Sequence, residues 1–165
     1  MRVRYSIVLA LTAVLALGAA SGAFATTFSY VANLSGANEV PANASTATGL
    51  AFVVYDDVAA TITVSVSWSG LTAPATAGHI HGPADTAHNA GVLFPFSGVP
   101  AATAGAIPTQ SFAINSTQVS YLNTQMLYVN IHTSTFPGGE IRGQIVPEAT
   151  PTGVASWGKI KQLYR

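Results

Sequence analysis

The sequence predicts an all-β fold, an antiparallel β-sandwich or small Greek-key barrel of about seven to eight strands with at most one short helix. Residues 60–69 alternate between apolar and hydroxyl side chains, which is the period of a strand with one buried face. Other short runs rich in β-branched and aromatic residues recur at about ten-residue spacing, bounded by Gly, Pro and Asn. Sustained helical periodicity is nearly absent from the chain.

The predicted elements can be placed in chain order. Strands are expected at residues 27–34, 48–55, 60–69, 79–81, 91–96, 106–114, 126–133 and 140–146. Asp56-Asp57 joins the second and third strands and predicts a hairpin, and Pro137-Gly138-Gly139 predicts a tight turn with a residue at positive φ between the last two. The one helix candidate is 117–125, with Asn115 or Ser116 as its N-cap.

Both ends of the chain differ from this pattern. Residues 1–25 have the three parts of a secretory signal peptide: Arg2 and Arg4, an apolar run over 5–20, and a small-x-small cleavage site at 23–25. The apolar run is shorter than the about 20 residues that a membrane-spanning helix needs. We therefore expect a secreted, periplasmic or cell-surface protein with no membrane span after cleavage. Residues 26–147 would form one β domain, followed by a linker and a short basic, aromatic tail over 148–165.

The composition excludes several classes of protein. Only 7% of the residues are charged and the formal net charge is zero, so there is no basic stripe for nucleic acid. The chain has no cysteine, which excludes disulfide scaffolds, thiolate metal sites, iron–sulfur clusters and cysteine nucleophiles. The motifs of serine hydrolases, β-lactamases and zinc proteases are also absent from the sequence. No catalytic residue is assigned, and a protein without enzymatic activity is favoured.

Three histidines form a candidate metal site. His79 and His81 are two residues apart on a predicted strand, so both point to one face and Ile80 points to the other. Residues at this spacing are about 6.6 Å apart, a distance that two imidazoles can close onto one ion. In the strand over 126–133, His132 lies on the polar face, opposite the apolar residues. If these strands are neighbours, the three imidazoles form a site that suits copper, zinc, nickel or iron.

Three further residues are candidates for parts of this metal site, and the same residues also allow an interpretation in which no metal binds. His88 is a candidate fourth ligand, and Glu140 and Arg142 are candidates for a second shell that orients the ligands or an incoming anion. On the structural interpretation the histidines belong to a partly exposed sheet face, because a His-x-His pair is a weak motif. Glu140 and Arg142 would then be an exposed pair that satisfies itself and adds little stability.

Three passages resemble the CHRD domain, a module named from chordin that also occurs in exported bacterial proteins. They are Leu34-Ser35-Gly36-Ala37-Asn38-Glu39-Val40-Pro41, Gly78-His79-Ile80-His81-Gly82-Pro83-Ala84, and Tyr128-Val129-Asn130-Ile131-His132-Thr133 continuing through 136–145. The resemblance covers residues 27–146 and implies an extracellular antiparallel β fold. It implies little about activity, because the biochemical role of the family is poorly defined.

A looser likeness to copper–zinc superoxide dismutases rests on the order of His79, His81, His132 and Arg142. The chain departs from those enzymes in having no cysteine pair and too few His and Asp in 81–91 for a separate zinc site. At most this likeness implies a mononuclear copper site. Three hypotheses follow: a binder of copper, with zinc as the alternative; a non-catalytic surface interaction module with structural histidines and an unknown partner; and a superoxide dismutase-like redox enzyme.

Overall fold

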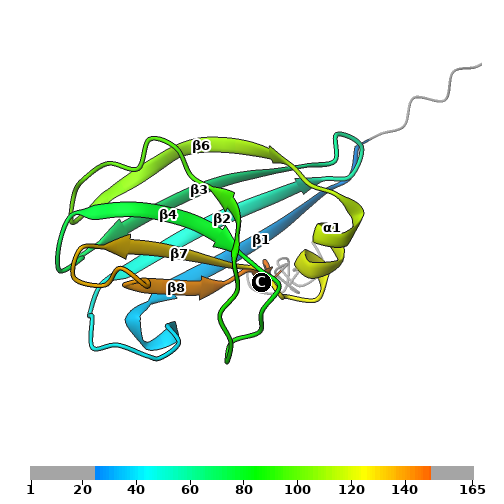
Figure 1. Ribbon diagram of the computed structural model, residues 1–165. Helices are drawn as coiled ribbons and strands as arrows, with labels where there is room; N and C mark the ends of the chain where they lie inside the picture. The colour runs from blue at the N-terminus through cyan, green and yellow to red at the C-terminus, as the bar shows by residue number, and fades with distance from the viewer. Residues whose placement is uncertain (1–24, 150–165) are drawn as a thin grey trace, which may run out of the picture.

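Strands make up most of the protein in the computed structural model, which describes residues 25–149. They form one antiparallel sheet that curls into a nearly closed barrel with two packed layers (Figure 1). The strands are β1 Thr27–Ser35, β2 Thr48–Asp56, β3 Thr61–Ser69, β4 Ala75–His81, β5 Val92–Pro95, β6 Gly105–Ala113, β7 Tyr128–Thr133, β8 Ile141–Gln144 and β9 Val146–Pro147. A 3₁₀ turn, η1 Gly36–Asn38, and one helix, α1 Ser116–Asn123, complete the described elements. The predicted all-β fold is confirmed.

The order of the strands is β5-β4-β7-β8-β1-β2-β3-β6, with β9 paired to β1. Strands adjacent in the sequence pair in β1-β2-β3, in β4-β5 and in β7-β8, whereas the pairings β3-β6, β4-β7 and β1-β8 join distant segments. The strand predicted over 140–146 is divided at Ile145, which is fully buried. As a result, β8 pairs with β7, whereas β9 pairs with β1.

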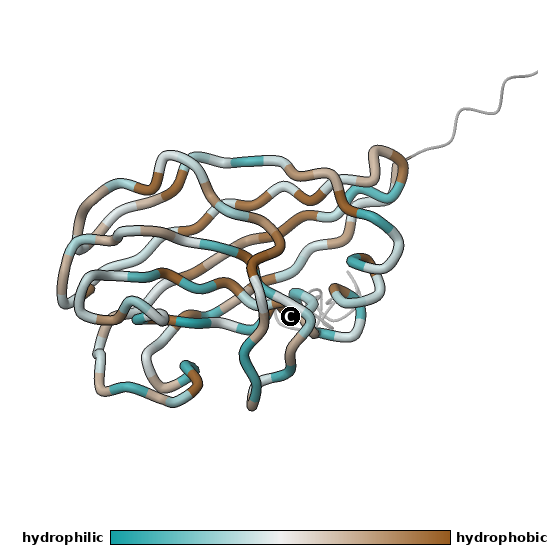
Figure 2. The backbone as a smooth tube through the Cα atoms, viewed as in Figure 1, coloured by the Kyte–Doolittle hydropathy of each residue, from teal (hydrophilic) through white to brown (hydrophobic). Residues whose placement is uncertain are grey.

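The core lies between the two layers and is built from alternate residues of each strand. Along β3, Ile62, Val64, Val66 and Trp68 are all buried, as their alternation predicts. Figure 2 shows the same alternation of apolar and polar positions along the long strands. Burial of an aliphatic side chain stabilises the fold by about 1.5–3 kcal/mol. This core is therefore the main source of stability in a chain that has no disulfide.

Both predicted turns are present. Asp56 ends β2, and its Oδ1 atom accepts hydrogen bonds from the backbone N–H groups of Val58 and Ala59, which closes the hairpin to β3. Before β8, Gly139 has φ +134°, a conformation that side chains with a Cβ rarely adopt. The Phe136 carbonyl accepts a hydrogen bond from the N–H of Gly139 and fixes this turn. The turn lies directly beside the polar residues described below.

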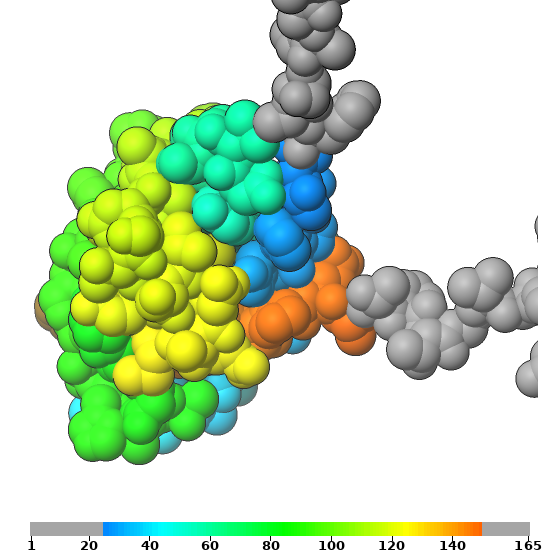
Figure 3. Space-filling model, turned by 90° about the vertical axis from the view of Figure 1, so that its right-hand side faces the viewer, coloured from blue at the N-terminus to red at the C-terminus, as the bar shows by residue number. Residues whose placement is uncertain are grey.

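Helix α1 begins after Asn115, one of the two predicted N-caps, and the cap is part of a capping box. The Asn115 side chain accepts from the Gln118 N–H, and the Gln118 side chain accepts from the Asn115 N–H. Leu122 is buried beneath the helix, and the Tyr30 hydroxyl donates to Asn123 at its end. Figure 3 shows the helix, in yellow, packed over one end of the molecule beside the blue and orange segments of β1 and β9.

The expectations for the chain ends lie outside the described residues. This applies to nearly all of the predicted signal peptide and to the tail from residue 150 onward. Within 25–149, none of the helical structure has the length and apolar character needed to cross a membrane.

Candidate metal site

Strands β4 and β7 are antiparallel neighbours, and this pairing brings the three predicted histidines together. In the register, His81 is opposite Tyr128, His79 is opposite Asn130, and Ala77 is opposite His132. Ile80 points into the core and is fully buried, so His79 and His81 share the other face, as predicted. One ring nitrogen from each histidine lies within 4.8 Å of those of the other two.

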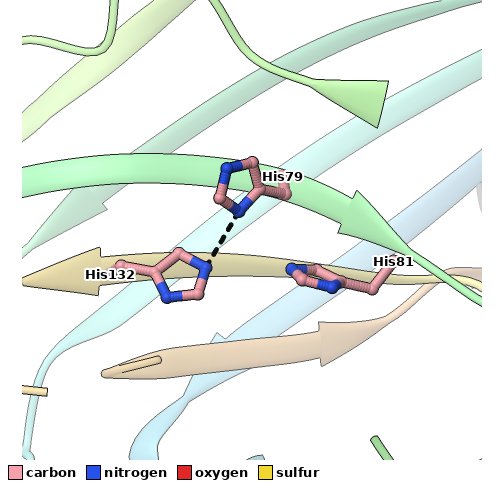
Figure 4. Close-up of side chains that lie close together, drawn as sticks. All are labelled: His79, His81 and His132. Carbon is pink, nitrogen blue, oxygen red and sulfur yellow. Dashed lines mark hydrogen bonds between the residues drawn. The ribbon is translucent and has the colours of Figure 1, made fainter. Parts of the chain in front are cut away.

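Figure 4 shows the three imidazoles gathered over β4 and β7, with one nitrogen of His81 directed toward the other two rings. The Nδ1 atom of His79 is 3.0 Å from the Nε2 atom of His132. The ring centre of His81 is 5.3 Å from that of His79 and 5.9 Å from that of His132. The nitrogens are therefore close enough to surround one ion with small side-chain adjustments.

Backbone carbonyls fix the tautomers of two of these rings. The Ala90 carbonyl oxygen is 3.0 Å from His81 Nδ1, and the Pro137 carbonyl oxygen is 3.0 Å from His132 Nδ1. Because a carbonyl oxygen only accepts, each Nδ1 carries the proton and each Nε2 keeps its lone pair. Metal-binding histidines are commonly oriented by such a bond from the other ring nitrogen.

His81 Nε2 is buried and has no hydrogen-bond partner among the described residues. A buried polar atom without a partner costs about 1–3 kcal/mol, so its presence calls for an explanation. Its lone pair faces the same space as the nitrogens of His79 and His132. A cation shared by the three rings would satisfy it.

The surroundings keep these histidines neutral. Burial lowers the pKa of His79 to about 4, helped by the neighbouring rings of His132 and His81. Burial also lowers the pKa of His81 and of His132, against the raising effect of their bonds to Ala90 and Pro137. A neutral imidazole is the form that binds a metal, so the cluster does not need to lose protons to solvent at neutral pH.

Arg142 lies beside the cluster and is separated from it by one aromatic ring. Its guanidinium carbon is 3.5 Å from the centre of the Tyr128 ring. The other face of Tyr128 stacks on His81, with the ring centres 4.9 Å apart and the planes at 5°. Arg142 thus contacts the site through Tyr128, which stacks on His81.

The alternative of an exposed Glu140–Arg142 pair is wrong, because both side chains are buried and each has other partners. The Glu140 carboxylate accepts hydrogen bonds from the Ser45 and Thr133 hydroxyls and from both the N–H and the hydroxyl of Thr72. Burial alone would raise the pKa of Glu140, but these bonds hold it below its usual value. Glu140 therefore fastens the loops before β2 and after β3 to the strand end, and its hydrogen-bond partners do not include the histidines.

His88 lies apart from the other three histidines. It is in the exposed loop between β4 and β5, where its Nδ1 is 2.7 Å from the Asp85 carboxylate. The described cluster of three does not include it.

The structure adds several residues that the sequence did not assign to the site. Tyr128 and Asn130 share the polar face of β7 with His132, and their alternation in the sequence was the available signal. Asn130 donates to the buried carboxylate of Glu39, which comes from the turn after β1. The carbonyls of Ala90 and Pro137 belong to loops, and no side-chain pattern identifies them.

The sequence matches one protein-family model, and the matched region contains the whole site. The family model described as the CHRD domain matches residues 30–145, which include all three histidines and the strands that carry them. No curated protein and no solved structure matches the sequence.

Proposed function

The chain belongs to the CHRD domain family, and we propose that this member is an exported protein that binds a transition metal ion, copper in preference to zinc, through His79, His81 and His132. Export is supported by the signal-peptide pattern of residues 1–25. Metal binding is supported by the geometry of the cluster.

One observation carries the proposal: a buried, unpartnered His81 Nε2 faces two further imidazoles within one ligand sphere. A purely structural histidine cluster would satisfy its buried nitrogens within the protein. Here carbonyls orient two rings so that each Nε2 carries a lone pair and no proton, and metal-binding histidines are commonly oriented in this way.

The preference for copper follows from the ligands. Imidazole nitrogens bind both copper and zinc, and for a given set of nitrogen ligands Cu²⁺ binds more tightly than Zn²⁺. The sequence offers no thiolate that would bias the site toward zinc. Tyr128 and Arg142 would act behind His81, holding its ring in place.

Titration calorimetry with Cu²⁺ and Zn²⁺ tests this proposal. The wild-type protein is expected to bind one ion, and the His79→Ala/His81→Ala double variant is expected to lose that binding. His88→Ala is the matched control, because it removes an exposed histidine that lies outside the cluster. Equal binding by the wild type and the double variant would refute the site.

A second candidate function, a surface interaction module, is favoured by a separate observation. Phe52 and Val54 project from the outer face of β2 with 46% and 37% of their surface exposed. Exposed apolar side chains that share one face of a sheet are typical of surfaces that contact another molecule. A Phe52→Ser variant that keeps its metal binding but loses retention on the producing cells would support this function.

A further inference from the structure

Arg142 is a buried cation whose partners are mainly neutral groups. Only 1% of its surface is exposed. Within residues 25–149 no carboxylate lies within ion-pair distance of it. Burial lowers its pKa, opposed by Tyr128, Glu39 and Asp85. Burying a charge is costly unless hydrogen bonds compensate it, so the hydrogen bonds of this guanidinium indicate its role in the protein.

Three of the four hydrogen bonds of this guanidinium go to one loop, and the fourth goes to Gln144 on the same strand. Nη2 donates to the Asp85 carbonyl at 2.7 Å, and Nη1 donates to the His88 carbonyl at 3.0 Å and to Asn89 Oδ1 at 3.1 Å. Three points of the loop between β4 and β5 are thus fixed by one planar side chain on β8. A lysine could not reproduce this, because an ammonium group is a point charge without the fork of the guanidinium.

The same loop ends at the carbonyl that orients His81. Ala90 directly follows Asn89, and its oxygen accepts the His81 Nδ1 proton. The N–H of Ala90 donates to the Tyr128 hydroxyl at 3.1 Å, and the Tyr128 ring lies between His81 and the guanidinium. Arg142 therefore supports His81 by two routes, through the loop and through the stacked ring.

We infer that Arg142 is a positioning residue of the histidine site: it holds residues 85–90 so that the Ala90 carbonyl keeps the His81 proton on Nδ1 and leaves Nε2 free for a metal. The metal part of this inference rests on the proposed function, whereas the tautomer part can be tested without a metal. His132 provides an internal reference, since its tautomer is set by the Pro137 carbonyl in a different turn.

The test is long-range ¹H–¹⁵N NMR of the histidine rings in the metal-free protein, comparing wild type with Arg142→Gln. A neutral histidine in water favours the Nε2–H tautomer, so a released His81 would move toward that form. We expect His81 and His132 to be Nδ1–H in the wild type, and only His81 to change in Arg142→Gln. Arg142→Lys is expected to show the same change, because it lacks the fork.

Glu140→Gln is the matched control for general destabilisation. It weakens another buried charged group of the same strand end, and both histidines are expected to keep their wild-type tautomers. A folded Arg142→Gln protein with an unchanged His81 would overturn the inference. So would a joint change of His81 and His132, or a wild-type spectrum for Arg142→Lys. If Arg142→Gln does not fold, Asn89→Ala removes one of the loop contacts and should produce a partial change at His81 alone.

A Cu²⁺ titration separates this inference from the proposed function. Arg142→Gln is expected to bind Cu²⁺ about 10–100-fold more weakly than the wild type, the usual effect of losing an outer-shell partner. Wild-type protein that binds no Cu²⁺ would refute the metal site, while the tautomer result would still decide the role of Arg142. Unchanged Cu²⁺ affinity in Arg142→Gln would contradict that role.

Discussion

The Nδ1 atom of His79 lies 3.0 Å from the Nε2 atom of His132, although 53 positions separate the two residues in the chain. Because His132 Nδ1 donates to Pro137, its Nε2 has no proton and must accept the hydrogen bond from His79. A metal ion held by His79 Nδ1 and His132 Nε2 would replace this hydrogen bond, and the single N–H proton of neutral His79 would then be on its Nε2. The site is therefore organised before the ion arrives, and binding requires little rearrangement of the backbone.

Metal binding is expected to stabilise the folded protein. A ligand that binds only the folded state adds about 2.7 kcal/mol when its free concentration is 100 times its dissociation constant. Excess Cu²⁺ should therefore raise the thermal midpoint of the wild type, and EDTA should reverse the rise. His79→Ala/His81→Ala should show no such shift. Equal shifts in both proteins would mean that Cu²⁺ acts elsewhere on the chain.

Glu140→Ala is expected to destabilise the fold without weakening the metal site. The change leaves the donors of Ser45, Thr72 and Thr133 without their acceptor, at a cost of about 3 kcal/mol or more. Urea unfolding measures this loss, with the exposed Glu148→Ala as a control expected to stay within about 0.5 kcal/mol. Weaker Cu²⁺ binding by the folded variant would show instead that the carboxylate acts on the histidines.

Gly139→Ala is expected to destabilise the turn beside His132. The glycine has φ +134°, and an added Cβ would collide with the Asn130 amide and the Glu39 carboxylate. We expect a loss of about 2 kcal/mol or more in urea unfolding. Gly138→Ala is the matched control, since a Cβ there meets no atom within 4 Å. Equal stabilities of the two variants would contradict this account of the turn.

Glu39 is expected to make stability fall as the pH rises from about 4.5 to 7. Burial raises its pKa to about 7, against the lowering effects of Arg142 and Asn130. The folded state therefore binds more protons than the unfolded state between about pH 4.5 and 7, and stability decreases with pH across that window. The histidines have the opposite shift, so the comparison must be with Glu39→Gln at each pH.

In urea unfolding, Glu39→Gln should gain stability relative to the wild type as the pH rises from about 4.5 to 7, and the difference should level off above that pH. Parallel curves for the two proteins would show that the carboxyl group is not perturbed. A change in the opposite direction would mean that Glu39 is held as a carboxylate in the folded protein.

Alternation in the sequence was enough to predict much of this fold. The buried side of β3 and the shared face of His79 and His81 follow directly from the period of two, and Asn115 was one of the two N-caps predicted for α1. These features depend only on residues that are close together in the chain, so a local sequence pattern is enough to predict them.

The remaining features depend on contacts between distant segments. No local pattern shows that β4 pairs with β7, or that the last predicted strand is divided at Ile145. Glu140 looked like a surface residue because its partners, Ser45 and Thr72, come from loops far away in the sequence. The orienting carbonyl of Ala90 carries no side-chain signal at all.

The most direct test of the central claim is a count of imidazole ligands by pulsed EPR in protein loaded with one equivalent of Cu²⁺. We predict three imidazoles in the wild type and in His88→Ala, and two in each single alanine variant of His79, His81 and His132. Unchanged counts in those three variants, or a count that falls in His88→Ala, would contradict a metal site formed by the cluster on β4 and β7.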